Sequence, residues 1–195
     1  EMSAYFTQLN NALVRRNFQL NGSDSMIFQG ELSQIQAIQN AALARVFGYH
    51  LGWEWKWTKK LYWKTDFNFQ EGFEELDNGS ISPSRHVAPF FGQSRIRYQT
   101  SKFTGEINAR FQGERSFDEL AFEERGKTEI YAKDAEGNPY APSWYTLNLK
   151  VQYQISDWLR INTGIENITD QRYRPYSSGL SGAGRNVYAS INVRF

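Results

Sequence analysis

Cysteine is absent from this chain of 195 residues, and so is any long apolar run. Without cysteine, the sequence excludes a disulfide framework and any metal site built on thiolates. No apolar stretch approaches the ~20 residues that a membrane-spanning helix needs. The mean hydropathy of -0.64 is also low. A transmembrane helix is therefore excluded.

The chain also lacks an excess of charge of either sign, because its 22 Lys and Arg residues nearly balance its 21 Asp and Glu residues. No basic cluster with interleaved aromatic residues is present, so we expect no nucleic-acid partner. Only His50 and His86 are available as imidazole ligands. Transition-metal sites usually need several nitrogen or sulfur ligands, so we expect no metal site and no cofactor.

Aromatic residues, in contrast, make up 16% of the chain, and apolar residues often alternate with polar ones. The segment 185–195 shows this best, because Val187, Ile191, Val193 and Phe195 share one face of a strand. The pattern predicts a strand that runs to Phe195, with one face toward lipid and the other toward water. A strand of a soluble β-sandwich gives the same local pattern, so this segment indicates a membrane barrel only if other segments of the chain repeat the pattern.

The alternation recurs along the chain. It predicts strands in segments 43–57, 61–74, 90–99, 103–117, 145–155, 159–166 and 185–195. Together with a first strand near residues 2–6, followed by a turn at 21–24, this makes about eight strands. Trp53, Trp55 and Trp57 gather at one end of their strand, as in the aromatic girdle of a membrane barrel.

Short and long connections between these strands alternate. The short ones are 58–60, 100–102 and 156–158, and the long ones are 77–89, 118–142 and 173–184. Bacterial outer-membrane barrels have short turns in the periplasm and long loops outside. We therefore expect the short turns and Phe195 on the periplasmic side.

Two periods fit residues 31–46. A helical stripe would use Leu32, Ile35, Ile38, Ala42 and Val46. The same segment also continues the odd-numbered alternation of the strand that includes Leu43. We expect one long strand that projects above the membrane.

A motif near the end of the chain carries a resemblance to a known family. Gly164-Ile-Glu-Asn-Ile-Thr-Asp-Gln-Arg-Tyr-Arg174 is followed by Ser178-Gly179, Gly184-Arg-Asn186 and the last strand to Phe195. This order resembles the C-terminal end of TonB-dependent outer-membrane receptors. The resemblance implies an all-β transmembrane antiparallel barrel of about 22 strands around a plugged lumen. Residues 1–195 would supply about the last eight strands, with the plug domain outside this chain.

The resemblance also implies a function in the bacterial outer membrane. Such a receptor imports a scarce ligand, such as a ferric siderophore, haem or another nutrient, and it is not an enzyme. Its partners would be outer-membrane lipid, the plug domain, the remaining barrel strands and the barrel assembly machinery. The TonB energy-coupling complex would act through an N-terminal part. The start at Glu1-Met-Ser carries no signal peptide, and we expect a piece of a longer chain.

Candidate site residues follow from the predicted faces. The lumen-facing or plug-facing candidates are Arg95, Arg97, Arg110, Glu106, Arg160 and Glu166. A solvated polar wall with local ion pairs is the alternative for each of them. His86 is the candidate in a ligand-binding loop. Phe195, Val193 and Ile191 form the candidate assembly signal. We expect no catalytic residue.

Two other interpretations stay open at this stage. A small self-contained outer-membrane barrel, either structural or a membrane-embedded hydrolase, would also have about eight strands. The sequence offers no Gly-x-Ser-x-Gly element to support a hydrolase.

The acidic loop 118–142 could gather Ca²⁺ but has no EF-hand spacing, so we expect a solvated loop. Its acidic residues are Glu119, Glu123, Glu124, Glu129, Asp134 and Glu136.

Overall fold

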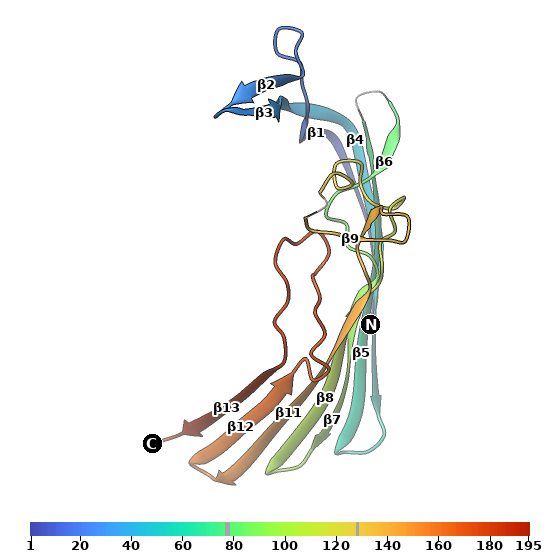
Figure 1. The fold of residues 1–195 in the computed structure, drawn as a ribbon. Coiled ribbons are helices and arrows are strands. Elements are labelled where there is room, and N and C mark those ends of the chain that lie inside the picture. Colours follow the sequence, from blue (N-terminus) through green and yellow to red (C-terminus); the bar gives the residue numbers. More distant parts are fainter. Residues whose placement is uncertain (77–78, 128) are drawn as a thin grey trace.

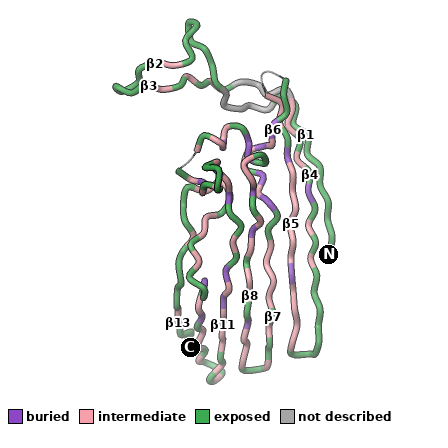
Figure 2. Tube along the Cα trace, turned by 45° about the vertical axis from the view of Figure 1, so that its right-hand side comes forward, coloured by how far each residue is buried: buried purple, intermediate pink, exposed green. Residues whose placement is uncertain are grey.

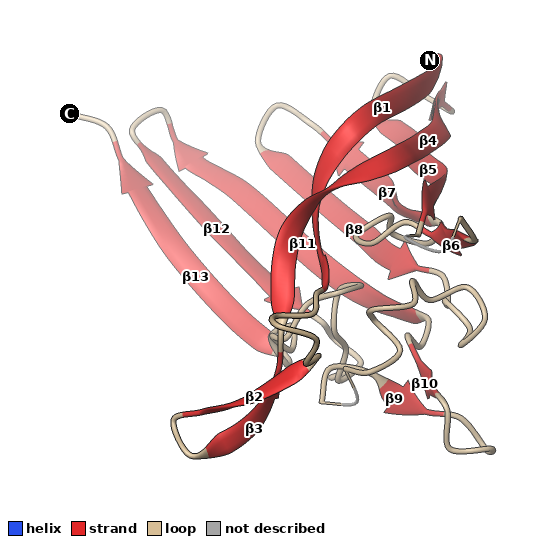
Figure 3. Cartoon of the chain, turned by 90° about the horizontal axis from the view of Figure 1, so that it is seen from above, coloured by secondary structure: helices blue, strands red, loops and turns tan. Residues whose placement is uncertain are grey.

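The computed structural model describes residues 1–76, 79–127 and 129–195, without the side chains of residues 12–16 and 39–42. In this part of the chain a single curved antiparallel sheet dominates (Figure 1). Its order is β1-β4-β5-β7-β8-β11-β12-β13, and β6 pairs with β5. Seen from above, the sheet is an open arc (Figure 3). The described residues contain no helix long and apolar enough to cross a membrane.

The strands of this sheet differ in length. Their bounds are β1 Met2–Asn17, β4 Gln36–Lys56, β5 Leu61–Glu75, β6 Ile81–Pro83, β7 Phe91–Gln99, β8 Phe103–Gln112, β11 Trp144–Ser156, β12 Leu159–Glu166 and β13 Asn186–Val193. Two separate hairpins complete the described structure. They are β2 Ser25–Phe28 with β3 Glu31–Gln34, and β9 Ala132–Lys133 with β10 Pro139–Tyr140.

Tight turns close the sheet at one end, as the short connections predict. The Thr58 hydroxyl accepts hydrogen bonds from the backbone N–H groups of Lys60 and Leu61 at 3.1 and 3.0 Å. Thr100 does the same for the N–H of Phe103 at 2.9 Å. A threonine side chain thus stands in for the missing ladder partner in both turns. We call this end of the sheet the turn end and the opposite end the loop end.

The two faces of the sheet separate apolar from polar side chains. Cross-strand neighbours on one face are apolar, and Ile96 lies opposite Ile107, which lies opposite Leu149. Ile107 is 58% exposed, which is unusual for an isoleucine in the middle of a sheet of a water-soluble protein but fits contact with lipid. Rings also pack on this face at the turn end, where the Trp57 and Trp63 centroids lie 6.3 Å apart. The predicted separation of apolar and polar faces is confirmed, and contact of the apolar face with lipid stays a prediction.

Both edges of the sheet are open along their backbone. Among the described residues, β1 pairs only with β4, and β13 pairs only with β12. Most of β13 is exposed, and so are the described side chains at the start of β1 (Figure 2). Unpaired strand edges are costly in lipid because no water is present to satisfy their N–H and C=O groups.

The long strand expected in residues 31–46 is confirmed from Gln36 onward, because β4 runs to Lys56 and pairs with β1 from Gln36, opposite Asn17, to Leu51, opposite Met2. The helical stripe is wrong. The sequence interpretation also missed the β2–β3 hairpin, whose turn uses Gln29 and Gly30 with positive φ angles of 53° and 88°. The glycine signals that turn, but glutamine in the left-handed region does not.

Several predicted segments need correction. The first strand, expected near residues 2–6, extends to Asn17, and the strand expected at 103–117 ends at Gln112. Loop 77–89 contains the short strand β6, and loop 118–142 contains the β9–β10 hairpin, so neither is featureless; residues 77–78 and 128 lie outside the described residues. The last strand ends at Val193 and does not continue to Phe195. Val193 lies opposite Leu159, the first residue of β12, so only the turn remains as a partner. Accordingly, the N–H of Arg194 bonds to the carbonyl of Trp158.

Tyrosine rings cover glycines on the polar face near both edges. Tyr5 lies opposite Gly48, and Tyr188 lies opposite Gly164. A Cβ on Gly48 would lie 2.7 Å from the Tyr5 ring, and one on Gly164 would lie 2.5 Å from the Tyr188 hydroxyl. A backbone carbonyl is also close to each Cβ, Phe69 O at 2.6 Å from that of Gly48 and Leu149 O at 2.7 Å from that of Gly164, so ring and backbone together require glycine.

A small apolar core lies at the loop end. Leu120, Tyr131 and Ala141 are buried together, and Ile130 and Tyr176 pack against them. We call the described residues of loops 77–89, 118–142 and 173–184 the loop layer. Its buried core shows that the loop layer is packed, whereas the sequence predicted a solvated loop at 118–142.

Candidate functional site: the polar face and the loop layer

Charged side chains form cross-strand rows on the polar face of the sheet. Antiparallel pairing places residues directly opposite one another, so their side chains meet on the same face. The rows run Lys64, Arg95, Asn108, Asn148; Asp66, Gln93, Arg110, Thr146; and Tyr62, Arg97, Glu106, Lys150.

Glu106 is the best-buried charge on this face, with 7% exposure. Arg97 donates from Nε to its Oε2 at 2.7 Å, and Asn108 donates from Nδ2 to its Oε1 at 3.3 Å. The Arg97 guanidinium also lies 5.6 Å from the centroid of the Tyr62 ring. The carboxylate is therefore compensated within the sheet, because a buried charge needs such partners.

A chain of amides continues from Glu106 toward the loop end. Asn148 donates from Nδ2 to Asn108 Oδ1 at 2.9 Å. Its own Oδ1 accepts the backbone N–H of Asn167 at 2.9 Å. These bonds fix each amide in one orientation and connect the middle of the polar face to the end of β12.

Four of the six predicted lumen-facing residues line one hollow of about 280 Å³. They are Arg95, Glu106, Arg110 and Glu166. Arg97 lines a neighbouring hollow of about 420 Å³ that also includes Arg95 and Glu106. Arg160 lies apart from both and donates to Gln154 Oε1 at 2.8 Å near the turn end. The structure thus brings five of the six candidates together, and their role in contacting a plug or ligand stays a prediction.

Two cationic side chains in the hollow that contains Arg95 and Glu106 lack a partner. The side chains of Arg110 and Lys150 make no hydrogen bond or ion pair within the described part of the chain. Arg95 has one carboxylate nearby, Asp66, at 3.9 Å. The hollow therefore presents positive charge that is free to meet an anionic group.

The Asn-Ile-Thr-Asp motif closes the end of β12. Asn167 is 3% exposed and has a φ of 49°. Its amide donates to the carbonyls of Gln171 and Ala183 at 2.9 and 3.1 Å and accepts the N–H of Gln171 at 3.0 Å. Asp170 Oδ1 accepts the backbone N–H of Arg185 at 2.7 Å. The two recognised motifs thus tie the start and end of the same loop together, next to β13.

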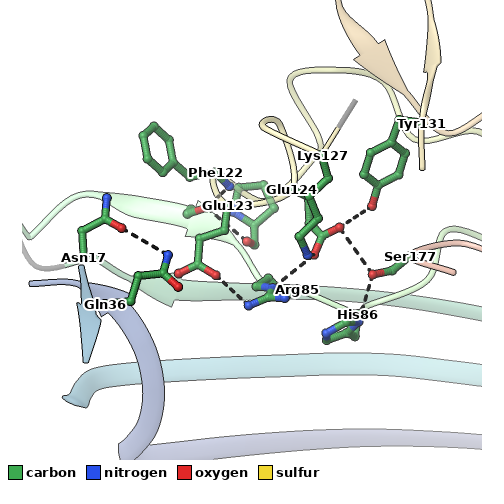
Figure 4. Close-up of polar contacts among 12 residues, drawn as sticks. Asn17, Gln36, Arg85, His86, Phe122, Glu123, Glu124, Lys127, Tyr131 and Ser177 are labelled. Carbon is green, nitrogen blue, oxygen red and sulfur yellow. Dashed lines mark hydrogen bonds and ion pairs between the residues drawn. The ribbon is translucent and has the colours of Figure 1, made fainter. Parts of the chain in front are cut away.

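Glu124 lies at the centre of the loop layer and is fully buried. Its Oε1 accepts from Arg85 Nε at 3.1 Å and from Lys127 Nζ at 2.6 Å, and its Oε2 accepts from the Tyr131 hydroxyl at 2.6 Å (Figure 4). Ser177 Oγ lies 3.4 Å from the same Oε2. We call these five residues the Glu124 cluster. They come from all three long loops.

The electrostatics of the cluster keep Glu124 ionised. Burial alone would raise its pKa, but hydrogen bonds from Lys127 and Tyr131 and the charges around it lower the pKa below its ordinary value. Burial and the bond to Glu124 both raise the pKa of Tyr131, so that hydroxyl stays protonated and acts as a donor. The cluster is thus a buried carboxylate held by fixed donors.

His86 is placed beside this cluster, in the loop where the sequence predicts a ligand-binding residue. Its Nδ1 lies 3.0 Å from Ser177 Oγ, and both residues have positive φ angles, 61° and 56°. A serine, a histidine and a glutamate therefore meet here. In a hydrolytic triad the acid orients the histidine, whereas Glu124 contacts the serine. The arrangement lacks that geometry.

The acidic loop gathers no metal site within the described residues, where no group of three or more acidic, histidine or cysteine side chains is close enough to hold an ion. Sequence reasoning singled out Glu124 only as a weak calcium candidate and missed Arg85 and Tyr131. Arg85 and Ser177, two of the partners of Glu124, lie 39 and 53 residues from it in the chain. No local spacing signals such contacts.

Comparisons with solved structures identify the architecture. The chain matches the copper transporter OprC with a TM-score of 0.71 and 12% identity over 100% of this chain and 28% of that one. It matches the FrpB iron transporter from Neisseria meningitidis with a TM-score of 0.66 and 16% identity, over 100% and 28% respectively. The fold is that of a TonB-dependent receptor barrel. The siderophore receptor PirA from Acinetobacter baumannii matches with a TM-score of 0.66 and 18% identity, over 100% and 29%.

No family model and no curated protein matches the sequence. The chain spans less than a third of the length of the receptors whose fold it shares, at 28% to 29%. The predicted fold class is confirmed at the level of a partial antiparallel barrel wall. The activity of a whole receptor remains a matter of proposal.

Proposed function

We propose that this chain forms the C-terminal wall of an outer-membrane receptor that imports a scarce nutrient with energy supplied through TonB. The observation that carries the proposal is the sheet itself. Its apolar face suits lipid, its polar face carries a charged hollow, and its whole length matches receptors that transport copper, iron or siderophores. The ligand would be a ferric siderophore, haem or another nutrient.

The open edges of the sheet support a larger barrel. β1 is 16 residues long and β13 is 8 residues long. Pairing these two edges with each other would leave half of β1 without a strand partner. We propose that the remaining barrel strands pair with both edges and that the plug domain fills the lumen against the polar face.

Arg110 and Lys150 are the residues we assign to plug or ligand contact. They are unpaired within the described residues and line the same hollow. Reversing both charges should lower uptake about tenfold or more, because a buried like-charge contact costs at least about 1.4 kcal/mol. The matched control is Arg160→Glu, since Arg160 lies apart from the hollow and bonds to Gln154. Equal uptake by the double variant and the control would contradict this assignment.

Uptake assays test the proposed function itself. A strain lacking the gene should lose uptake of one labelled substrate among ferric siderophores, haem and copper, and the full-length gene should restore it. Deleting tonB should abolish the restored uptake. Uptake that persists without TonB would refute the energy coupling, and a deletion that changes no uptake would refute the transport function.

Nothing favours a hydrolase as a second candidate. Ser177 and His86 are in contact, but the carboxylate of Glu124 contacts the serine and does not orient the histidine. We therefore expect Ser177→Ala to leave any esterase signal of the membrane fraction unchanged.

A further inference from the structure

The three long loops are joined at several points by side chains from distant parts of the sequence. Arg85 bonds to both Glu123 and Glu124, and Ser177 contacts both His86 and Glu124. The loops therefore share contacts, and the buried carboxylate of Glu124 touches both of the other loops (Figure 4).

The geometry of Glu124 distinguishes it from the other acids of the layer. Both of its oxygens are occupied, with Arg85 and Lys127 on one and Tyr131 and Ser177 on the other. Hydrogen bonds to a buried charge are the strong ones, because water cannot replace them. Glu123 contrasts with it, since its side chain is 31% exposed and, among the described residues, its carboxylate bonds only to Arg85.

Tyr131 links this polar centre to the apolar core of the layer. Its hydroxyl bonds to Glu124, and its ring is buried with Leu120 and Ala141. The Tyr176 ring, from the third loop, lies 6.4 Å from it. A cavity of about 350 Å³ also has Tyr131 in its wall, together with Trp144 and Tyr173. Loosening Tyr131 therefore affects two loops and one cavity at once.

We propose that Glu124 locks the three long loops into one body, which opens as a unit and holds the cavity beside Tyr131 in shape. Glu124 is then a positioning residue, because it acts through Arg85, Tyr131 and Ser177. A ligand or partner that opens one loop must open the other two. The proposal rests only on contacts among the three loops, so its test does not depend on the proposed transport function.

Hydrogen exchange of backbone amides tests this, because each loop contains one protected reporter. The Ser84 N–H bonds to Gly72 O at 2.8 Å, the Phe122 N–H to Ser82 Oγ at 3.1 Å, and the Tyr176 N–H to Gln112 Oε1 at 3.1 Å. Exchange would be measured by mass spectrometry on the full-length protein in detergent micelles, for the wild type and Glu124→Gln.

The expected result is a joint increase in exchange at all three reporters, by at least about tenfold, with the strands of the sheet unchanged. The matched control is Glu123→Gln, which removes one partly exposed ion pair and should change exchange less than about threefold. Tyr131→Phe provides a milder second variant, which keeps the ring and should raise exchange in the same three loops.

Two results would overturn the inference. One is an increase confined to Phe122, in the loop that contains Glu124, with Ser84 and Tyr176 unchanged. The other is an equal effect of Glu123→Gln. If Glu124→Gln does not assemble, Tyr131→Phe decides the matter by the same comparison.

Discussion

An arginine placed on the apolar face should be strongly destabilising, and Ile107 is the position that shows this best. It lies midway along β8, is 58% exposed, and has Ile96 and Leu149 directly opposite on its two neighbouring strands. If this face meets the hydrocarbon core, Ile107→Arg should cost about 2 to 4 kcal/mol, the range for Arg or Lys at the middle of a bilayer. That cost lowers the folding equilibrium about 30-fold to 1,000-fold.

The assay is equilibrium unfolding of the full-length protein in phospholipid bilayers by guanidinium chloride, followed by tryptophan fluorescence. Two controls isolate the membrane contribution. Gln152→Arg puts the same charge on the polar face, away from hydrocarbon, and should cost less than about 1 kcal/mol. Leu61→Arg stays on the apolar face but lies at the turn end, where the cost should fall to about 0 to 1 kcal/mol. Equal costs at Ile107 and Gln152 would refute contact between the apolar face and lipid.

Four further predictions concern the motifs, the edges and the loop layer. Asn167→Ala should cost about 2 to 4 kcal/mol in the same unfolding assay, because it removes three hydrogen bonds at a buried residue with positive φ; a cost under about 1 kcal/mol would show that the motif is dispensable for folding. Gly164→Ala should cost about 1 to 3 kcal/mol through the Tyr188 hydroxyl and the Leu149 carbonyl, and Tyr188→Ala should recover part of it in a double-mutant cycle; simple additivity would argue against ring coverage. The pKa of Glu124 is lowered in the folded state, so its stabilisation is present above the ordinary carboxyl value of 4.5 and is lost as pH falls through the folded pKa. The protection of the Phe122 amide, measured as its exchange rate relative to the intrinsic rate at the same pH, should therefore fall in acid, and Glu124→Gln should abolish that pH dependence. Deleting Phe195, which lies beyond β13, should reduce the amount of protein assembled in the outer membrane without weakening strand pairing, and normal membrane levels would count against its role as an assembly signal.

Much of the sheet is predictable from the sequence because alternation has a direct physical cause. Successive side chains of a strand point to opposite faces, so residues 43–57 and 145–155 reveal both the strand and its apolar side. The alternation of short turns and long loops then indicates the order of the hairpins. The residues Arg95, Arg97, Glu106 and Arg110 could be assigned to one face by this rule alone.

The loop layer was not predictable in the same way. Its stability depends on contacts such as Arg85 with Glu124 and Tyr131 with Leu120, which no local period encodes. The boundary at Val193 also escaped prediction, because a strand ends where its partner ends and not where its alternation ends. The β2–β3 hairpin was missed since Gln29 adopts a conformation that its residue type rarely takes.

We propose that this sheet is one wall of a larger barrel with its polar face toward the lumen. The decisive measurement is a structure of the full-length protein in lipid, determined by electron cryomicroscopy. We expect the free edges of β1 and β13 each to pair with a strand outside residues 1–195, and a plug to contact Arg110 and Lys150. Direct pairing of β1 with β13 into a closed small barrel, or lipid against the polar face, would contradict it.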